Sequence, residues 1–88
     1  MLKASLNTKN KGFFNFFMYK EEDGGYVAAC LNLNIVEYGE DPNELKKSIE
    51  EAALSFLESV RKKNLSDDYL NQVPEKGLLQ KLKELEYV

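Results

Sequence analysis

The side chains with the greatest chemical reactivity are scarce in this chain. Among 88 residues there is one cysteine, Cys30, and no histidine, which is the commonest metal ligand. Cys30 therefore has neither a histidine partner for a nucleophilic pair nor a second cysteine for a disulfide. Glycine-rich phosphate-binding loops are absent from the sequence. This composition favours binding over catalysis, so we expect no enzyme activity and no cofactor, with Cys30 packed in the core.

Acidic side chains are the remaining groups that could do chemistry. Glu21, Glu22 and Asp23 precede two glycines, and Glu37 lies further along the chain. These carboxylates could contact a basic partner protein, or they could hold Mg²⁺ as the carboxylates of a nuclease do. Because consecutive acids in a turn mostly point into water, a solvated turn is the simplest alternative. We predict these four residues as partner contacts and expect no metal site.

Charge is unevenly distributed along the chain. Residues 1–20 contain four lysines and no acid, residues 21–60 contain ten acids and two lysines, and residues 61–88 contain six bases and five acids. An acidic middle region repels nucleic acid and attracts a basic partner. The same acids would also serve solubility alone, and that alternative stays open.

Three strands are expected before any helix. Aromatic residues run almost without interruption over residues 13–19, turn residues follow over 21–25, and a second apolar run occupies 26–31. This pattern predicts an antiparallel hairpin. A third apolar run over 33–38 ends at Gly39 and extends the hairpin to a three-stranded meander.

A long helix is predicted next. Asp41 suits its N-cap, Pro42 suits its first turn, and basic residues lead to a stop at Asn64. The apolar residues between these ends recur at helical spacing and predict a stripe over one sheet face; they are Leu45, Ile49, Ala52, Ala53, Phe56 and Val60. After one short turn within 66–72, a second helix opens at Gly77. The sequence leaves open whether this domain or another chain covers its leucines, Leu78, Leu79, Leu82 and Leu85.

The length limits the chain to one small domain. A chain of 88 residues buries only about 60–65% of its unfolded surface, so its core is thin. We expect an α+β domain with an N-terminal arm (1–12), a core (13–63) and a C-terminal linker and helix (64–88). Two open sheet edges predict a homodimer. The lack of a membrane-length apolar run and of a signal pattern predicts a cytoplasmic protein with no membrane or small-molecule partner.

A set of motifs lies in order within residues 13–60. They are Phe17, the segment Glu22-Asp23-Gly24-Gly25-Tyr26-Val27-Ala28-Ala29-Cys30, Leu33, and Gly39-Glu40-Asp41 ahead of an acid-rich helix. Together they resemble the HicB-type antitoxin family. The chain departs from the family pattern at Leu31, where the family has proline, at Asn32, where it has aspartate, and at Pro42, which stands in for a capping threonine.

The resemblance implies a β-β-β-α arrangement like a truncated ribonuclease H fold. It also implies a protein that binds a small basic HicA-type toxin, an mRNA-cleaving ribonuclease, and neutralises it by occlusion. Many members of the family also repress their own operon, but residues 64–88 offer one clear helix and balanced charge, so we do not expect DNA binding. Two alternatives are a solitary HicB-like dimeric interaction or regulatory module, and a metal-dependent nuclease of the ribonuclease H type.

Overall fold

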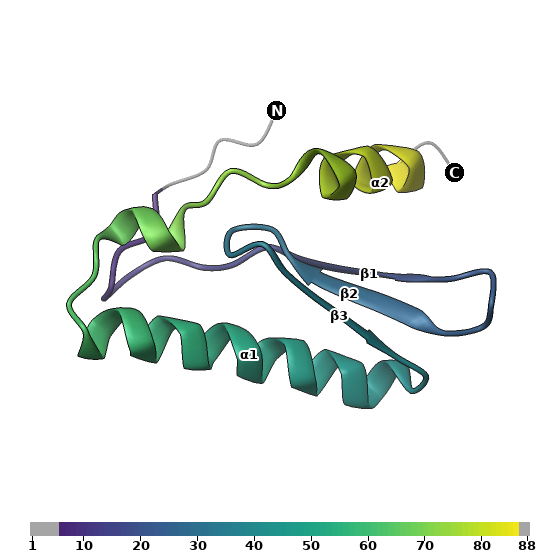
Figure 1. Ribbon diagram of the computed structural model, residues 1–88, viewed down its shortest axis with the longest axis horizontal. Coiled ribbons are helices and arrows are strands. Elements are labelled where there is room, and N and C mark those ends of the chain that lie inside the picture. Colours follow the sequence, from purple (N-terminus) through teal and green to yellow (C-terminus); the bar gives the residue numbers. More distant parts are fainter. Residues whose placement is uncertain (1–5, 87–88) are drawn as a thin grey trace.

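The computed structural model describes residues 6–86, with side chains as far as residue 84. The elements in chain order are β1 (Phe16–Lys20), β2 (Tyr26–Cys30), β3 (Ile35–Gly39), α1 (Pro42–Lys62), the short 3₁₀ helix η1 (Asp67–Leu70) and α2 (Lys76–Glu86) (Figure 1). The three strands form one antiparallel sheet in the order β1-β2-β3, which confirms the predicted α+β class. Within the described residues, no helix is long and apolar enough to cross a membrane.

The outer strands are shorter than the apolar runs that predict them. The β1 ladder ends at Asn15, whose N–H donates to Oδ1 of Asn32 (2.7 Å) rather than to strand backbone, so β1 starts later than residue 13. β3 starts later than residue 33 because residues 31–34 form a turn in which Asn34 takes a positive φ of 54°. The apolar pattern thus extends beyond the starts of β1 and β3, but Asn15 and Asn34 end the strand pairing there.

Helices cover both faces of the sheet, which gives three layers (Figure 1). Alternate side chains of the central strand point to opposite faces. Ala28 packs with Leu45 and Ile49 of α1, whereas Ala29 packs with Leu78 of α2. The long helix thus covers one sheet face as predicted, and the C-terminal helix covers part of the other.

The leucines of α2 contact the sheet of their own chain. Leu78 is buried and Leu82 is half-buried, and both pack in the cluster that includes Phe17 of β1. Leu79 is exposed, and the side chain of Leu85 lies outside the described residues. The sequence leaves open whether this domain or another chain covers these leucines. In the structure, Leu78 and Leu82 are covered by their own domain.

Both ends of α1 carry the caps that the sequence predicts. At the start, Oδ1 of Asp41 accepts the N–H of Asn43 (2.9 Å). At the end, Asn64 takes a positive φ of 50°, and the N–H of Leu65 donates to the carbonyl of Val60 (2.9 Å). This is the hydrogen-bond pattern of a Schellman turn, which stops the helix and directs the chain back toward the sheet.

Residues 6–12 of the N-terminal arm are held firmly against η1. Asn7 is only 4% exposed; its Nδ2 donates to the carbonyl of Leu70 (3.0 Å), and its Oδ1 accepts the N–H of Phe13 (2.8 Å). The backbone N–H and carbonyl of Asn7 also bond to Oδ1 (2.7 Å) and Nδ2 (2.8 Å) of Asn71. The arm lacks a periodic pattern because polar bonds, rather than apolar packing, hold it in place. Residues 1–5 of the arm lie outside the described residues.

Candidate partner-binding surface

The predicted acidic turn joins β1 to β2 and has a defined backbone conformation. The N–H of Glu21 donates to the carbonyl of Gly25 (2.7 Å), and Gly24 takes a φ of 97°, which favours glycine. Oδ1 of Asp23 accepts the N–H of Gly25 (2.9 Å). Glu22 is exposed at the tip of the turn. The turn thus holds three carboxylates at one end of the sheet.

Tyr38 connects this turn to β3. Its hydroxyl donates to Oδ2 of Asp23 (3.0 Å), while the side chain remains 57% exposed. A Cβ at Gly25 would collide with the phenol in this position, so a larger residue there would displace the ring from the turn. The hydrogen bond to Asp23, together with the negative charges of Asp23, Glu40 and Glu21, raises the pKa of Tyr38 above its ordinary value of 10.0. Tyr38 therefore keeps its proton and acts as a hydrogen-bond donor within an acidic surface.

Glu37 points to the opposite face of β3, toward α1. Its Oε1 accepts a hydrogen bond from the hydroxyl of Ser48 (2.6 Å). The four predicted contacts therefore lie on two sides of the sheet, with the turn acids beside Tyr38 on one side and Glu37 on the other. Sequence reasoning did not select Tyr38 or Glu40, although an aromatic residue between two acids was a usable signal.

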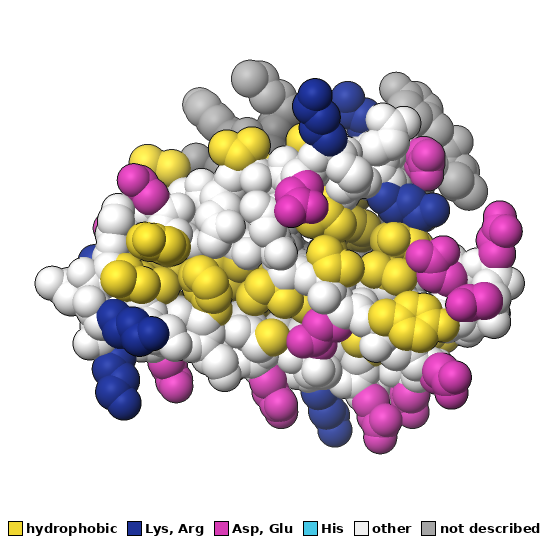
Figure 2. Space-filling model, viewed as in Figure 1, with side chains coloured by type: hydrophobic (Ala, Val, Ile, Leu, Met, Phe, Trp, Pro, Cys, Tyr) yellow, Lys and Arg dark blue, Asp and Glu magenta, His cyan; other side chains and the backbone are white. Residues whose placement is uncertain are grey.

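A groove runs between β3 and the first turns of α1. Its volume is about 440 Å³, and the acidic residues among those that line it are Glu37, Glu40, Asp41 and Glu44. None of the described lining residues is basic. Many acids lie at this end of the molecule, whereas Lys and Arg are scattered over α2, along α1 and at its far end (Figure 2). The negative charges interact favourably with the positive N-terminal end of the α1 dipole. Because no basic side chain in the groove balances them, the groove is suited to cationic side chains.

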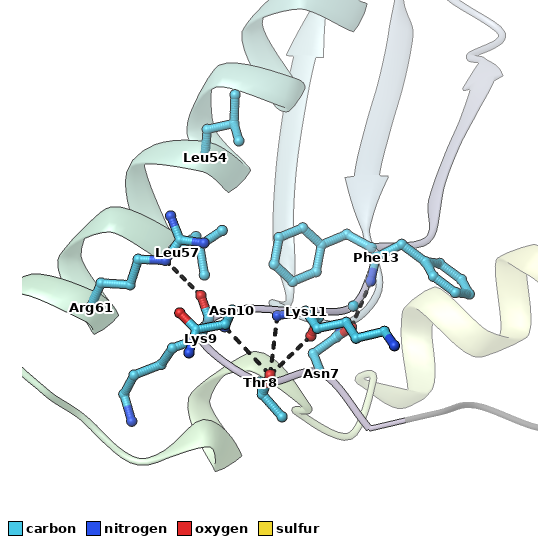
Figure 3. A pocket seen from close by; sticks show the side chains of 11 residues that line it. Asn7, Thr8, Lys9, Asn10, Lys11, Phe13, Leu54, Leu57 and Arg61 are labelled. Carbon is cyan, nitrogen blue, oxygen red and sulfur yellow. Dashed lines mark hydrogen bonds between the residues drawn. The ribbon is translucent and has the colours of Figure 1, made fainter.

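A second hollow lies at the other end of α1, beside the N-terminal segment (Figure 3). Its volume is about 220 Å³, and Leu54, Leu57 and Phe13 form part of its wall. Nε of Arg61 donates to the carbonyl of Lys9 (2.6 Å), which ties the segment to the helix. Since ligand sites usually occupy about 300–1,000 Å³, this hollow is better explained as part of how the segment is anchored.

Cys30 is fully buried, as predicted for a packing cysteine. Burial raises the pKa of its thiol above 9.0, which disfavours the reactive thiolate. Among the residues that the structure describes, no three or more His, Cys, Asp or Glu side chains come together as a metal-ion site would require. The acidic groove is thus the feature of the described surface with the most distinctive chemistry.

The chain matches no family model, no curated protein and no solved structure. The three-layer fold and the acidic surface beside β3 are therefore the observations on which a function is proposed.

Proposed function

We propose that this protein is a HicB-type antitoxin that binds and neutralises a small, basic, mRNA-cleaving toxin of the HicA type in the cytoplasm. The observation that carries the proposal is the meeting of the acidic turn, exposed Tyr38 and the acidic groove at the end of the sheet where β3 leads into α1. The motifs within residues 13–60 support the same function. The observed β-β-β-α order agrees with the truncated ribonuclease H arrangement that the resemblance implies.

The proposed mechanism is occlusion by charge and shape. A ribonuclease must attract the phosphates of RNA, so its active site or RNA-binding face carries basic side chains. Glu21, Glu22, Asp23 and Glu37 attract those same side chains, and the antitoxin then occupies the face in place of RNA. Such a mechanism needs no catalytic residue in this chain.

We also propose that two copies pair through the open edge of β1. A hollow of about 390 Å³ beside this edge is lined mainly by apolar residues of β1, β2 and α1, and Phe16 in its wall is 41% exposed. If two β1 strands pair antiparallel over their full length, Met18 lies at the centre and Phe16 lies opposite Lys20 of the second copy. No like charges then face each other, and the thin core gains buried apolar surface.

The antitoxin proposal is tested by co-expression with any small basic protein whose gene lies beside its own. We expect the neighbour alone to arrest growth, this chain to restore growth, and the two proteins to co-elute in size-exclusion chromatography. If the neighbour is not toxic, or if the two do not co-elute, the antitoxin function is wrong and a solitary dimeric module replaces it.

Matched charge reversals locate the contact. The double variant Glu22→Lys with Glu40→Lys alters the acidic end and should abolish both rescue and co-elution, since it repels a basic partner. Glu58→Lys with Asp68→Lys changes the net charge equally, but at exposed positions toward the far end of α1. This control should still rescue growth; equal loss in both doubles would show that total charge, rather than the acidic end, is responsible.

A further inference from the structure

The backbone of β3 presents hydrogen-bond groups along its outer side. Directly after β2, the N–H of Leu31 donates to the carbonyl of Asn15 (2.9 Å), the residue before β1, so odd-numbered residues of β2 bond to β1. Because backbone direction alternates along a strand, the even-numbered residues of β2 bond to β3, and their partners include Glu37. Val36 and Tyr38 therefore point their N–H and carbonyl groups outward. Within residues 6–86, no strand pairs with this edge.

The side chains of the same two residues form an uncovered apolar surface. Val36 is 50% exposed and Tyr38 is 57% exposed. The leucines of α2 lie over β1 and β2, so they leave the β3 side of this face open. A band of hydrophobic side chains is visible between the two helices on this side of the molecule (Figure 2). Free backbone groups next to an apolar surface are the features by which a sheet accepts an added strand.

The opposite face of the same edge carries negative charge. Here the groove between β3 and α1 has Glu37, Glu40, Asp41 and Glu44 in its wall. In an added strand, side chains alternate between the two faces. An incoming segment with basic residues at alternate positions would therefore place them in the groove, while its apolar residues pack beside Val36 and Tyr38.

The charge of β3 argues against a second copy of this chain at the same edge. If two β3 strands paired antiparallel over their full length, Glu37 of each copy would lie directly opposite the other. Like charges directly opposite destabilise a strand pair, and the acidic groove of each copy would add to the repulsion. A basic segment would instead place positive charges opposite Glu37 and in the acidic groove, and opposite charges stabilise a strand pair.

We propose that the outer edge of β3 takes an extended, basic segment of a partner protein as a fourth strand, paired to the backbone of Val36 and Tyr38 and with its Lys or Arg side chains in the acidic groove. The inference deepens the proposed antitoxin function by stating how the toxin is held. It does not depend on the identity of that toxin, because the edge can be tested with a synthetic strand.

The test measures hydrogen exchange at single amides by NMR. The probe is a short blocked peptide of alternating valine and arginine, and its comparison peptides replace arginine with glutamate or carry N-methyl groups that prevent strand pairing. We expect only the unmodified basic peptide to slow exchange at the amides of Val36 and Tyr38, by about tenfold or more. Protection that instead grows with protein concentration, without peptide, would assign the edge to a second copy and overturn the proposal.

A backbone variant separates strand pairing from simple charge attraction. Val36→Pro removes one outward N–H and leaves the ladder to β2 intact, since proline is tolerated on an edge strand when its nitrogen faces solvent. It should weaken peptide binding about tenfold relative to Val36→Thr, which keeps the N–H and shares the loss of the valine side chain. Equal binding by both variants would overturn the proposal. Independently of how Val36→Pro folds, Glu37→Gln with Glu40→Gln should weaken binding and reduce its sensitivity to salt.

The same variants distinguish this inference from the antitoxin function. If Val36→Pro, confirmed as folded by its NMR spectrum, still neutralises a toxic neighbour as well as the parent does, strand addition is wrong while the antitoxin function stands. If no neighbour is toxic but the basic peptide protects Val36 and Tyr38, the edge is a strand acceptor and the antitoxin function is wrong.

Discussion

Asn7 shows how much one side chain contributes to this small domain. Its amide bonds to the carbonyl of Leu70 and the N–H of Phe13 in a nearly buried position. Asn7→Ala leaves both groups without partners, so we expect the free energy of unfolding to fall by about 2–3 kcal/mol, measured by urea denaturation. Asn10→Ala, at an exposed position in the same loop, should change it by less than about 0.5 kcal/mol. Similar losses in both variants would contradict this account.

Tyr38 gives a prediction about pH. Its pKa is raised in the folded protein, first by the hydrogen bond to Asp23. The resulting stabilisation is complete below the unfolded pKa of about 10 and is lost as the pH rises through the folded value. Asp23→Asn should lower the pKa of Tyr38, followed by NMR titration of its ring signals, while Glu22→Gln should leave it nearly unchanged. An unaltered titration in Asp23→Asn would refute the assigned cause.

Residues that act through local sequence were predictable, and residues that act across the fold were not. The capping role of Asp41 depends only on the following turn of the helix, so its position in the sequence was sufficient. The pairing of Tyr38 with Asp23 depends on the strand register, and that of Asn7 with Asn71 joins positions 64 apart. No local pattern contains such information.

At the scale of elements, α2 is the least firmly attached helix. Leu78 is buried against the sheet and Leu82 is half-buried, whereas Leu79 faces solvent. Leu78→Ala should lower the free energy of opening α2 by about 2 kcal/mol, as measured by hydrogen exchange of the α2 amides. Leu79→Ala should change it by less than about 0.5 kcal/mol. If the two variants behave alike, the observed docking of α2 is wrong.

The long helix was predictable because caps and an apolar stripe agree over its whole length. The strands were predicted in order and number, but their ends moved where Asn15 and Asn34 take up turn and side-chain hydrogen bonds. The partner surface of α2 was not predictable, because a leucine stripe specifies an apolar neighbour without saying which one.

The whole molecule is expected to dimerise through β1. Light scattering at micromolar concentration should give twice the chain mass of 10.1 kDa. Phe16→Lys would place a lysine opposite Lys20 of the second copy, so it should give a monomer. Phe13→Lys changes an exposed aromatic residue outside the strand and should leave the dimer intact. A monomeric parent protein would contradict the dimer, without affecting the proposal for the β3 edge.

The bonds between Asn7 and Asn71 also determine how the protein would carry mechanical load. They join positions 64 apart, so the three strands and α1 lie inside a loop closed by the side-chain amide of Asn71 on the backbone of Asn7. When the chain is pulled from both ends, tension first detaches α2, then loads the hydrogen bonds of residues 72–75 to Asn32 and Asn34, and then reaches the bonds between Asn7 and Asn71. The chain between these two asparagines can therefore lengthen only after the bonds between them have opened.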